Sequence, residues 1–545
     1  MQQKNNQKKF KKFKFNPIII IFFILEAIFT FILCQKLFPE KGEILADATD
    51  QMNLEFALIA SFVKGMNKRS DVLSCVRNPF YLNASVTSEY ITTFYAALMK
   101  IGGVPITFSI QIQTFFLFMS VYILQFSFTY RITNNTFASL LSSLAVILPG
   151  GFGFMNWPIF KVRTQKTVDY INIISKDHSI FWGHPLVHCF LISRTSILSL
   201  SLSIFTYILL ESKLDKFAGI SLMMSSITRP QNGFILMIFY LFYCSDFEKF
   251  LNNIFSGPSL KMKIKDQFKE YFIRIIMVVL NFLIYFITNI DFQKSSSMWS
   301  KSSSTSSAVP FISFFISCYG MHFFGFITSF NLKRSINFIM TLLLYYFCGW
   351  YTFQSLHRQN FAIVFSVLSP IIISYSFASY GRFYNRLKNM ETMGIYNAIL
   401  LFVFIIGATS ALLGFENRQK NTVFRSTYNE TDLVEWVVQN TSRFDVFYNK
   451  FAMRWNPAVT KAGRQLFYGD DNMMPYLIDN FEKNKKMVLT IYYKNFTYPD
   501  IDYFIYLTSD KDGKDIRDHH KDILKLEYEN DKYFIFKNII KHKND

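Results

Sequence analysis

The sequence contains few charged residues for its length. Asp, Glu, Lys and Arg make up 17% of its 545 residues, whereas soluble proteins usually carry about 25%. Hydrophobic residues make up 51% of the chain, and apolar runs recur near the roughly 20 residues that cross a bilayer as a helix. We therefore predict a polytopic α-helical membrane protein.

Motifs of several other functions are absent. The chain has no separate basic domain with base-stacking aromatic residues, no glycine-rich phosphate loop and no serine nucleophile elbow. Nucleotide hydrolysis and acyl transfer by those routes, and nucleic acid as a partner, are therefore unsupported. The net charge of +19 is interpreted as a topology signal instead, because cytosolic loops of membrane proteins are rich in Lys and Arg.

Cysteine is also scarce. None of the six cysteines lies in residues 416–545, so no disulfide can stabilise that region. Cys75 and Cys189 fall in segments predicted to share one side of the membrane and could pair. The other four fall in predicted spans, where cysteine acts as a small apolar residue.

The basic, acid-free residues 1–16 directly precede the apolar run Pro17–Leu37. The run is long for a signal peptide and lacks a small-residue cleavage site. We interpret residues 1–16 as a cytosolic tail and the run as an uncleaved signal anchor oriented by the positive-inside rule.

Propagating that orientation predicts three parts of the chain. Residues 17–415 form a transmembrane domain of about 11 helices, with lumenal loops at 39–103 and 156–194. Residues 416–545 form a lumenal soluble domain of α/β or α+β type. The membrane is predicted to be the endoplasmic reticulum or another secretory-pathway membrane.

The stretch Phe217–Tyr243 is interrupted by the polar residues Thr228–Gly233. It is too short for two full spans and too polar at its centre for one. A pair of short helices fits, and its apex is predicted to face a site, because irregular backbone at membrane depth needs burial or a wet cavity.

The C-terminal region is polar and contains alternating segments. Met487–Tyr493, Tyr503–Leu507 and Tyr533–Phe536 are predicted strands, and an amphipathic helix is predicted around Leu433–Val438. The sequons that fall on the predicted lumenal side are candidate glycosylation sites, at Asn83, Asn429, Asn440 and Asn495.

The segment Pro39–Asn53 follows the first apolar run. Read as a helix, it places Glu43, Asp47 and Asp50 on one acidic stripe. Three carboxylates on one face repel each other, so some should bind a cation or titrate with raised pKa values. The stripe could be a proton-abstracting base, an ion ligand or a solvated rim.

A second polar group precedes the predicted fourth span and contains Asp177, His178, His184 and His188. The intervening Glu of a zinc-hydrolase motif is missing, and Pro185 opens the turn. Polar packing at the membrane boundary, contact with an acceptor or phosphate, and a metal site remain alternatives.

Three arginines, Arg194, Arg229 and Arg358, fall at lumenal helix ends in the predicted topology. Arginine at a membrane interface can be a snorkelling anchor. It can also bind a phosphate bidentately.

This layout resembles the GT-C superfamily of integral-membrane glycosyltransferases, which includes protein mannosyltransferases and lipid A aminoarabinose transferases. The local resemblance lies in Glu43–Asp50, His184–Ser196 and Ala462–Gly469, the last with Asp445-Val446-Phe447 upstream as in uncharacterised GT-C-like membrane proteins. The paired Asp-Glu of many members is absent from the first loop, which leaves the choice of base open.

The resemblance implies a sugar donor linked to a lipid phosphate, such as dolichyl phosphate, and an acceptor hydroxyl on a protein, glycan or lipid. Asp47 is the preferred base, with Asp50 and Glu43 beside it. Arg194, Arg229 or Arg358 would neutralise the leaving phosphate. A single displacement would invert the configuration at the anomeric carbon. Whether a divalent metal takes part is left open by the resemblance.

Two hypotheses from other functional classes are alternatives to an enzyme. A solute or lipid transporter would use ionisable groups near mid-membrane, for which Glu26, His322 and the Arg229 apex are candidates. A catalytically inactive scaffold with a lumenal interaction domain is the third reading. The polar residues gather in lumenal loops, which favours an enzyme.

Overall fold

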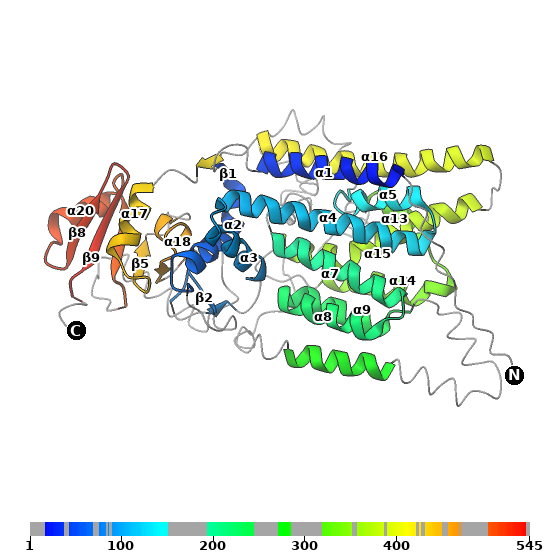
Figure 1. The fold of residues 1–545 in the computed structure, drawn as a ribbon, viewed down its shortest axis with the longest axis horizontal. Coiled ribbons are helices and arrows are strands. Elements are labelled where there is room, and N and C mark those ends of the chain that lie inside the picture. The colour runs from blue at the N-terminus through cyan, green and yellow to red at the C-terminus, as the bar shows by residue number, and fades with distance from the viewer. Residues whose placement is uncertain are drawn as a thin grey trace.

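The computed structural model shows a bundle of helices at one end of the molecule and a small domain with a β-sheet at the other (Figure 1). The described residues are 17–37, 43–68, 76–82, 85–86, 90–150, 193–244, 271–284, 319–350, 357–385, 390–420, 424–426, 431–449, 456–467, 469 and 500–540.

Three described helices are long and apolar enough to cross a membrane. These segments are Pro17–Gln35 of α1 (Pro17–Leu37), the whole of α4 (Ile106–Thr133) and Gly394–Leu413 of α16 (Met390–Lys420). The other described helices of the bundle are α5 Thr136–Ala145, α7 Arg194–Glu211, α8 Asp215–Thr228, α9 Pro230–Phe242, Tyr271–Ile284, α13 Met321–Ile327, α14 Ser335–Trp350 and α15 His357–Asn385.

The surface of the bundle is apolar. On α1, Ile18, Ile21, Leu25 and Phe31 are each more than half exposed, whereas Glu26 is fully buried. Apolar side chains outside and polar side chains inside are what a lipid environment stabilises, because lipid cannot hydrogen-bond a polar group.

Polar side chains join the helices inside the bundle. Thr129 on α4 lies 2.8 Å from Ser374 on α15 and accepts a 2.7 Å hydrogen bond from Ser142 on α5. Gln125 donates to Ser374 at 3.0 Å. Small hydroxyl residues let the helix backbones approach closely and hold them there.

The predicted break between two short helices is confirmed. Helices α8 and α9 meet at Arg229, whose backbone is extended, and Pro230 opens α9. The two helices pack closely, because a Cβ added at Gly233 would overlap Ser226.

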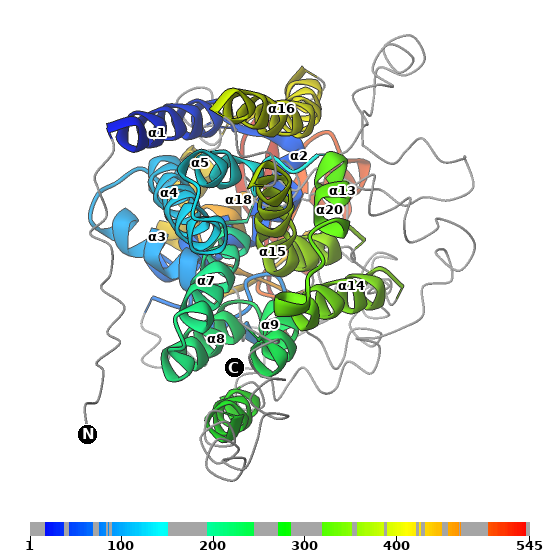
Figure 2. The same ribbon diagram turned by 90° about the vertical axis from the view of Figure 1, so that its right-hand side faces the viewer.

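Short elements connect α1 to α4. They are β1 (Glu43–Leu45), α2 (Ala46–Val63), β2 (Val76–Arg77), β3 (Ser85–Val86) and α3 (Ile91–Ile101). Strand β1 pairs antiparallel with β4 (Phe424–Ser426), which follows α16 in the chain. The segments after α1 and after α16 therefore meet, and those two helices lie side by side in both views (Figures 1 and 2).

The C-terminal domain contains a five-stranded mixed sheet in the order β6-β5-β7-β9-β8. Strand β5 pairs in parallel with β6 and β7, while β9 pairs antiparallel with β7 and β8. The elements are α17 Thr431–Asn440, β5 Val446–Asn449, α18 Pro457–Thr460, β6 Gln465–Leu466, β7 Tyr503–Leu507, α20 Lys511–His519, β8 Leu524–Glu529 and β9 Tyr533–Asn538.

Several predictions for this domain are confirmed. Tyr503–Leu507 is β7, Tyr533–Phe536 lies within β9, and the predicted helix at Leu433–Val438 lies within α17. The predicted strand Met487–Tyr493 lies outside the described residues, as do Cys75 and Cys189.

Candidate functional site

Helix α2 connects the bundle to the C-terminal domain, and its start carries two of the predicted carboxylates. Asp47 and Asp50 lie in its first two turns, but Glu43 lies on strand β1. The prediction of one helical stripe that includes Glu43 is therefore wrong. Backbone pairing of Glu43 with Ser426 and of Leu45 with Phe424 replaces the first helical turn.

A buried ion pair attaches α2 to α7. The guanidinium of Arg194, the first residue of α7, pairs with the carboxylate of Glu55, and both side chains are largely removed from solvent. Sequence reasoning missed Glu55. Its signal was a lone carboxylate within the apolar segment Leu54–Val63, since a buried charge needs a partner.

Arg229 reaches the same turn of α7. Its Nη1 donates to the hydroxyl of Ser196, two residues after Arg194, and the side chain is buried. The extended backbone at Arg229 ends α8 and begins α9. Two of the three predicted arginines thus gather at the N-terminus of α7, where the helix dipole adds positive potential.

Further hydrogen bonds tie α3 and α4 to this place. The hydroxyls of Thr195 and Thr92 lie 3.1 Å apart, and Gln113 on α4 donates to the Thr92 carbonyl at 2.9 Å. The N-terminus of α7 is therefore surrounded by α2, α3 and the α8–α9 break. A charged cluster that is buried and positively polarised suits an anionic ligand.

The remaining predicted site residues are less fully described. Arg358 is the second residue of α15, and only its backbone is described. Asn440 ends α17, is exposed, and donates to the Trp436 carbonyl at 2.9 Å. The others lie outside the described residues: Asp177, His178, His184, His188, Asn83, Asn429 and Asn495.

Within the described residues, no group of three or more His, Cys, Asp or Glu side chains could hold a metal ion.

The C-terminal domain docks on the end of α2 through Arg464. Its guanidinium donates to the Thr441 hydroxyl at 2.9 Å, to the Val437 carbonyl at 3.1 Å and to the Lys64 carbonyl at 3.3 Å. Burial lowers the pKa of Arg464, while nearby Asp445 opposes that shift. One arginine thus joins α17 to the residue that follows α2.

No protein-family description matches the sequence, and no curated protein is similar to it in sequence. Solved structures do match. ArnT from Cupriavidus metallidurans bound to undecaprenyl phosphate has a TM-score of 0.51 and 8% identity, covering 96% of this chain and 98% of that chain.

A second match is arabinofuranosyltransferase AftD from Mycobacteria, with a TM-score of 0.54 and 11% identity. It covers 89% of this chain, which spans about a third (35%) of that one. Together these matches show that the chain has the fold of the GT-C glycosyltransferases, helical in the membrane with a C-terminal mixed sheet. The resemblance stated from the sequence is confirmed at the level of the fold.

Proposed function

We propose that the protein transfers a sugar from a polyprenyl-phosphate or dolichyl-phosphate donor to an acceptor hydroxyl. The observation that carries this proposal is the meeting of Arg194 and Arg229 at the N-terminus of α7, which Arg194 joins to α2 through Glu55. Asp47 and Asp50 lie in the first two turns of α2. A base and a binding site for a leaving phosphate are the two groups that such a transfer needs. The GT-C fold supports the same class of reaction.

In the proposed reaction, Asp47 accepts the proton of the acceptor hydroxyl as its oxygen attacks the anomeric carbon. The bond from that carbon to the phosphate oxygen breaks, and its electron pair leaves with the lipid phosphate. Arg194 and Arg229 stabilise the charge that grows on the phosphate. Attack opposite the leaving group inverts the anomeric configuration.

Several finer assignments belong to this proposal. The bundle crosses the membrane about 11 times, with the C-terminal domain on the lumenal side of a secretory-pathway membrane and glycans on Asn83, Asn429, Asn440 and Asn495. Arg358 contributes to phosphate binding, and the segment with Asp177, His178, His184 and His188 contacts the acceptor or the phosphate.

The test is donor turnover by the purified protein in lipid. Dolichyl-phosphate mannose and dolichyl-phosphate glucose are supplied separately, and released lipid phosphate is measured. We expect Asp47→Asn to lower turnover by about 10²- to 10⁴-fold, the usual effect of losing a general base. Asp522→Asn, which changes an exposed carboxylate between α20 and β8, should have no effect.

Other results would change the proposal in defined ways. Turnover that survives Asp47→Asn but not Asp50→Asn assigns the base to Asp50. Turnover unaffected by substitution of Asp47, Asp50 and Glu43 removes the carboxylate mechanism. Failure of the folded wild type to release phosphate from either donor contradicts transfer of these two sugars.

A transporter is the second candidate, because ionisable side chains are buried in the bundle. Glu26 on α1 is fully buried and accepts a hydrogen bond from Ser143 on α5, and His322 on α13 lies 3.4 Å from the Ser376 hydroxyl. Ionisable groups inside a membrane domain commonly mark transport paths. Solute flux into liposomes that Glu26→Gln abolishes, without donor turnover, would favour this function.

A further inference from the structure

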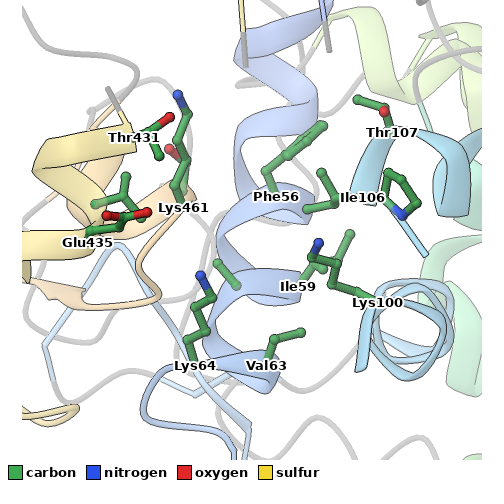
Figure 3. A pocket seen from close by; sticks show the side chains of 14 residues that line it. Phe56, Ile59, Val63, Lys64, Lys100, Ile106, Thr107, Thr431, Glu435 and Lys461 are labelled. Atoms are coloured by element: carbon green, nitrogen blue, oxygen red, sulfur yellow. The ribbon is translucent and has the colours of Figure 1, made fainter. Parts of the chain in front are cut away.

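A cavity of about 330 Å³ lies where the bundle meets the C-terminal domain. Helix α2 contributes one wall, the connection from α3 to α4 another, and α17 and α18 a third. Figure 3 shows its side chains, with Thr431 and Glu435 on one side of α2 and Ile106 and Thr107 on the other.

Three lysines from three different elements line this cavity. Lys64 follows α2, Lys100 lies in the last turn of α3, and Lys461 follows α18 (Figure 3). Glu435 is the one carboxylate among the residues that line it. Within the described parts of the chain, the ammonium groups of Lys64 and Lys100 form no ion pair. The cavity therefore carries an excess of positive charge that attracts an anion.

The rest of the cavity wall is mainly apolar. Phe56, Ile59 and Val63 project into it from one face of α2, and Ile106 projects from the start of α4. A small inorganic anion would leave this apolar surface in contact with water. A ligand that combines an anionic group with an apolar chain can contact both the lysine side chains and the apolar side chains of the cavity.

The cavity also lies at the depth where a membrane span begins. Ile106 is the first residue of α4, which is long and apolar enough to cross the bilayer. Neighbouring Leu98, Ile101 and Phe108 are 49%, 61% and 52% exposed, as expected for side chains that face lipid. Lipid head groups lie at this depth.

We propose that this cavity binds the head group of an anionic membrane lipid. Its phosphate lies between Lys64, Lys100 and Lys461, and its acyl chains extend along Ile106 and the exposed face of α3. The site is separate from the candidate reaction site, since neither Arg194 nor Arg229 lines it. The bound head group bridges α2, α3 and the C-terminal domain and so strengthens their docking.

The test measures lipid binding to the full-length protein and requires no sugar donor, so it is independent of the proposed transferase activity. Protein in detergent is titrated with phosphatidylglycerol or phosphatidylcholine, and bound lipid is counted by native mass spectrometry. We expect a clear preference for phosphatidylglycerol. Each single Lys→Gln substitution should weaken binding about fivefold, and the triple variant roughly 100-fold, since a lysine near an anionic lipid contributes about 1 kcal/mol.

The matched control replaces Lys68, Lys514 and Lys521 with Gln, which removes the same charge from exposed positions that do not line the cavity. It should bind phosphatidylglycerol within about twofold of the wild type, because most surface substitutions have small effects. An equal loss in control and cavity variants would show general charge attraction and overturn the proposal, as would no preference for the anionic lipid. Displacement of the lipid by an equal concentration of inorganic phosphate would identify free phosphate as the ligand and overturn the lipid assignment.

Discussion

The pair of Arg194 and Glu55 places two opposite charges in a site with little solvent. Their side chains are 2% and 12% exposed, so water screens them weakly. Such a pair adds little net stability to the folded state, but removing one partner is costly, because the remaining charge would stay buried without compensation.

Replacing Glu55 alone should therefore destabilise the protein strongly. We expect Glu55→Gln to cost about 3–5 kcal/mol, because the Arg194 guanidinium loses its anionic partner. The double variant Glu55→Gln with Arg194→Gln should recover part of that loss, and thermal unfolding in detergent measures both. A double variant whose loss equals the sum of the two single losses would show that the two side chains are not coupled.

Tyr503 gives the C-terminal domain a stability that depends on pH. Burial, assisted by the charges of Asp445, Glu527 and Asp502, raises the pKa of the Tyr503 hydroxyl from 10.0 to about 12. The folded state therefore keeps a proton that the unfolded state loses above its lower pKa. The resulting stabilisation is complete below pH 10 and declines as the pH rises through 12.

As the pH is raised from 10 to 12, we expect the unfolding temperature of the wild type to decrease. In Tyr503→Phe this decrease should be smaller. Phenylalanine has no ionisable group, so its stability cannot depend on this proton. Unfolding followed by circular dichroism across that range tests the expectation, with exposed Tyr95→Phe as the control. An unchanged pH profile in Tyr503→Phe would assign the loss to other groups.

At the scale of elements, two glycines let α2 meet the turn between α18 and β6. A Cβ added at Gly65 would overlap the carbonyl oxygen of Gly463, and one added at Gly463 would overlap the backbone of Ala60 and Ser61. Gly463 also has a φ of +72°, which favours glycine. Backbone contacts this close explain why the domain docks at one position on α2.

Alanine at either glycine should separate these elements. We expect Gly65→Ala or Gly463→Ala to cost about 1–3 kcal/mol, the usual range for overpacking, and to increase proteolysis after α16. Gly394→Ala on α16 is the matched control, because a Cβ there meets nothing within 4 Å. Proteolysis of the two variants at the wild-type rate would show that the domain does not depend on this contact.

At the scale of the whole molecule, one end of the bundle brings together the described charged residues of the candidate site that lie on α2 and α7 and at the α8–α9 break. Strand β1 pairs with β4, Arg464 joins the domain to the end of α2, and Glu55 joins α2 to α7. Helix α2 is therefore held at its start, middle and end by segments that are distant in sequence. Contacts at several points along a helix keep its charged side chains in one arrangement.

Part of this arrangement could be predicted from local sequence. Pro17–Leu37 was predicted as a span and forms α1 over the same residues, and the break at Arg229 follows from a polar, proline-containing interruption. Tyr503–Leu507 alternates as a strand should and is β7. Each of these depends on hydropathy, period or turn residues within a short window.

Other features depend on partners far along the chain. Glu43 was predicted on a helix, but Ser426 supplies the strand that pairs with it. The ion pair of Arg194 with Glu55 and the cavity among Lys64, Lys100 and Lys461 also join separate segments. No local pattern could identify these partners.

The sequence by itself determined the membrane class and the approximate helix pattern, because partition between lipid and water acts on each segment separately. Only the tertiary structure decided which charges meet at the N-terminus of α7 and which line the cavity. Those pairings depend on how α2, α7 and the C-terminal domain pack together, and packing is a property of segments that are distant in the chain.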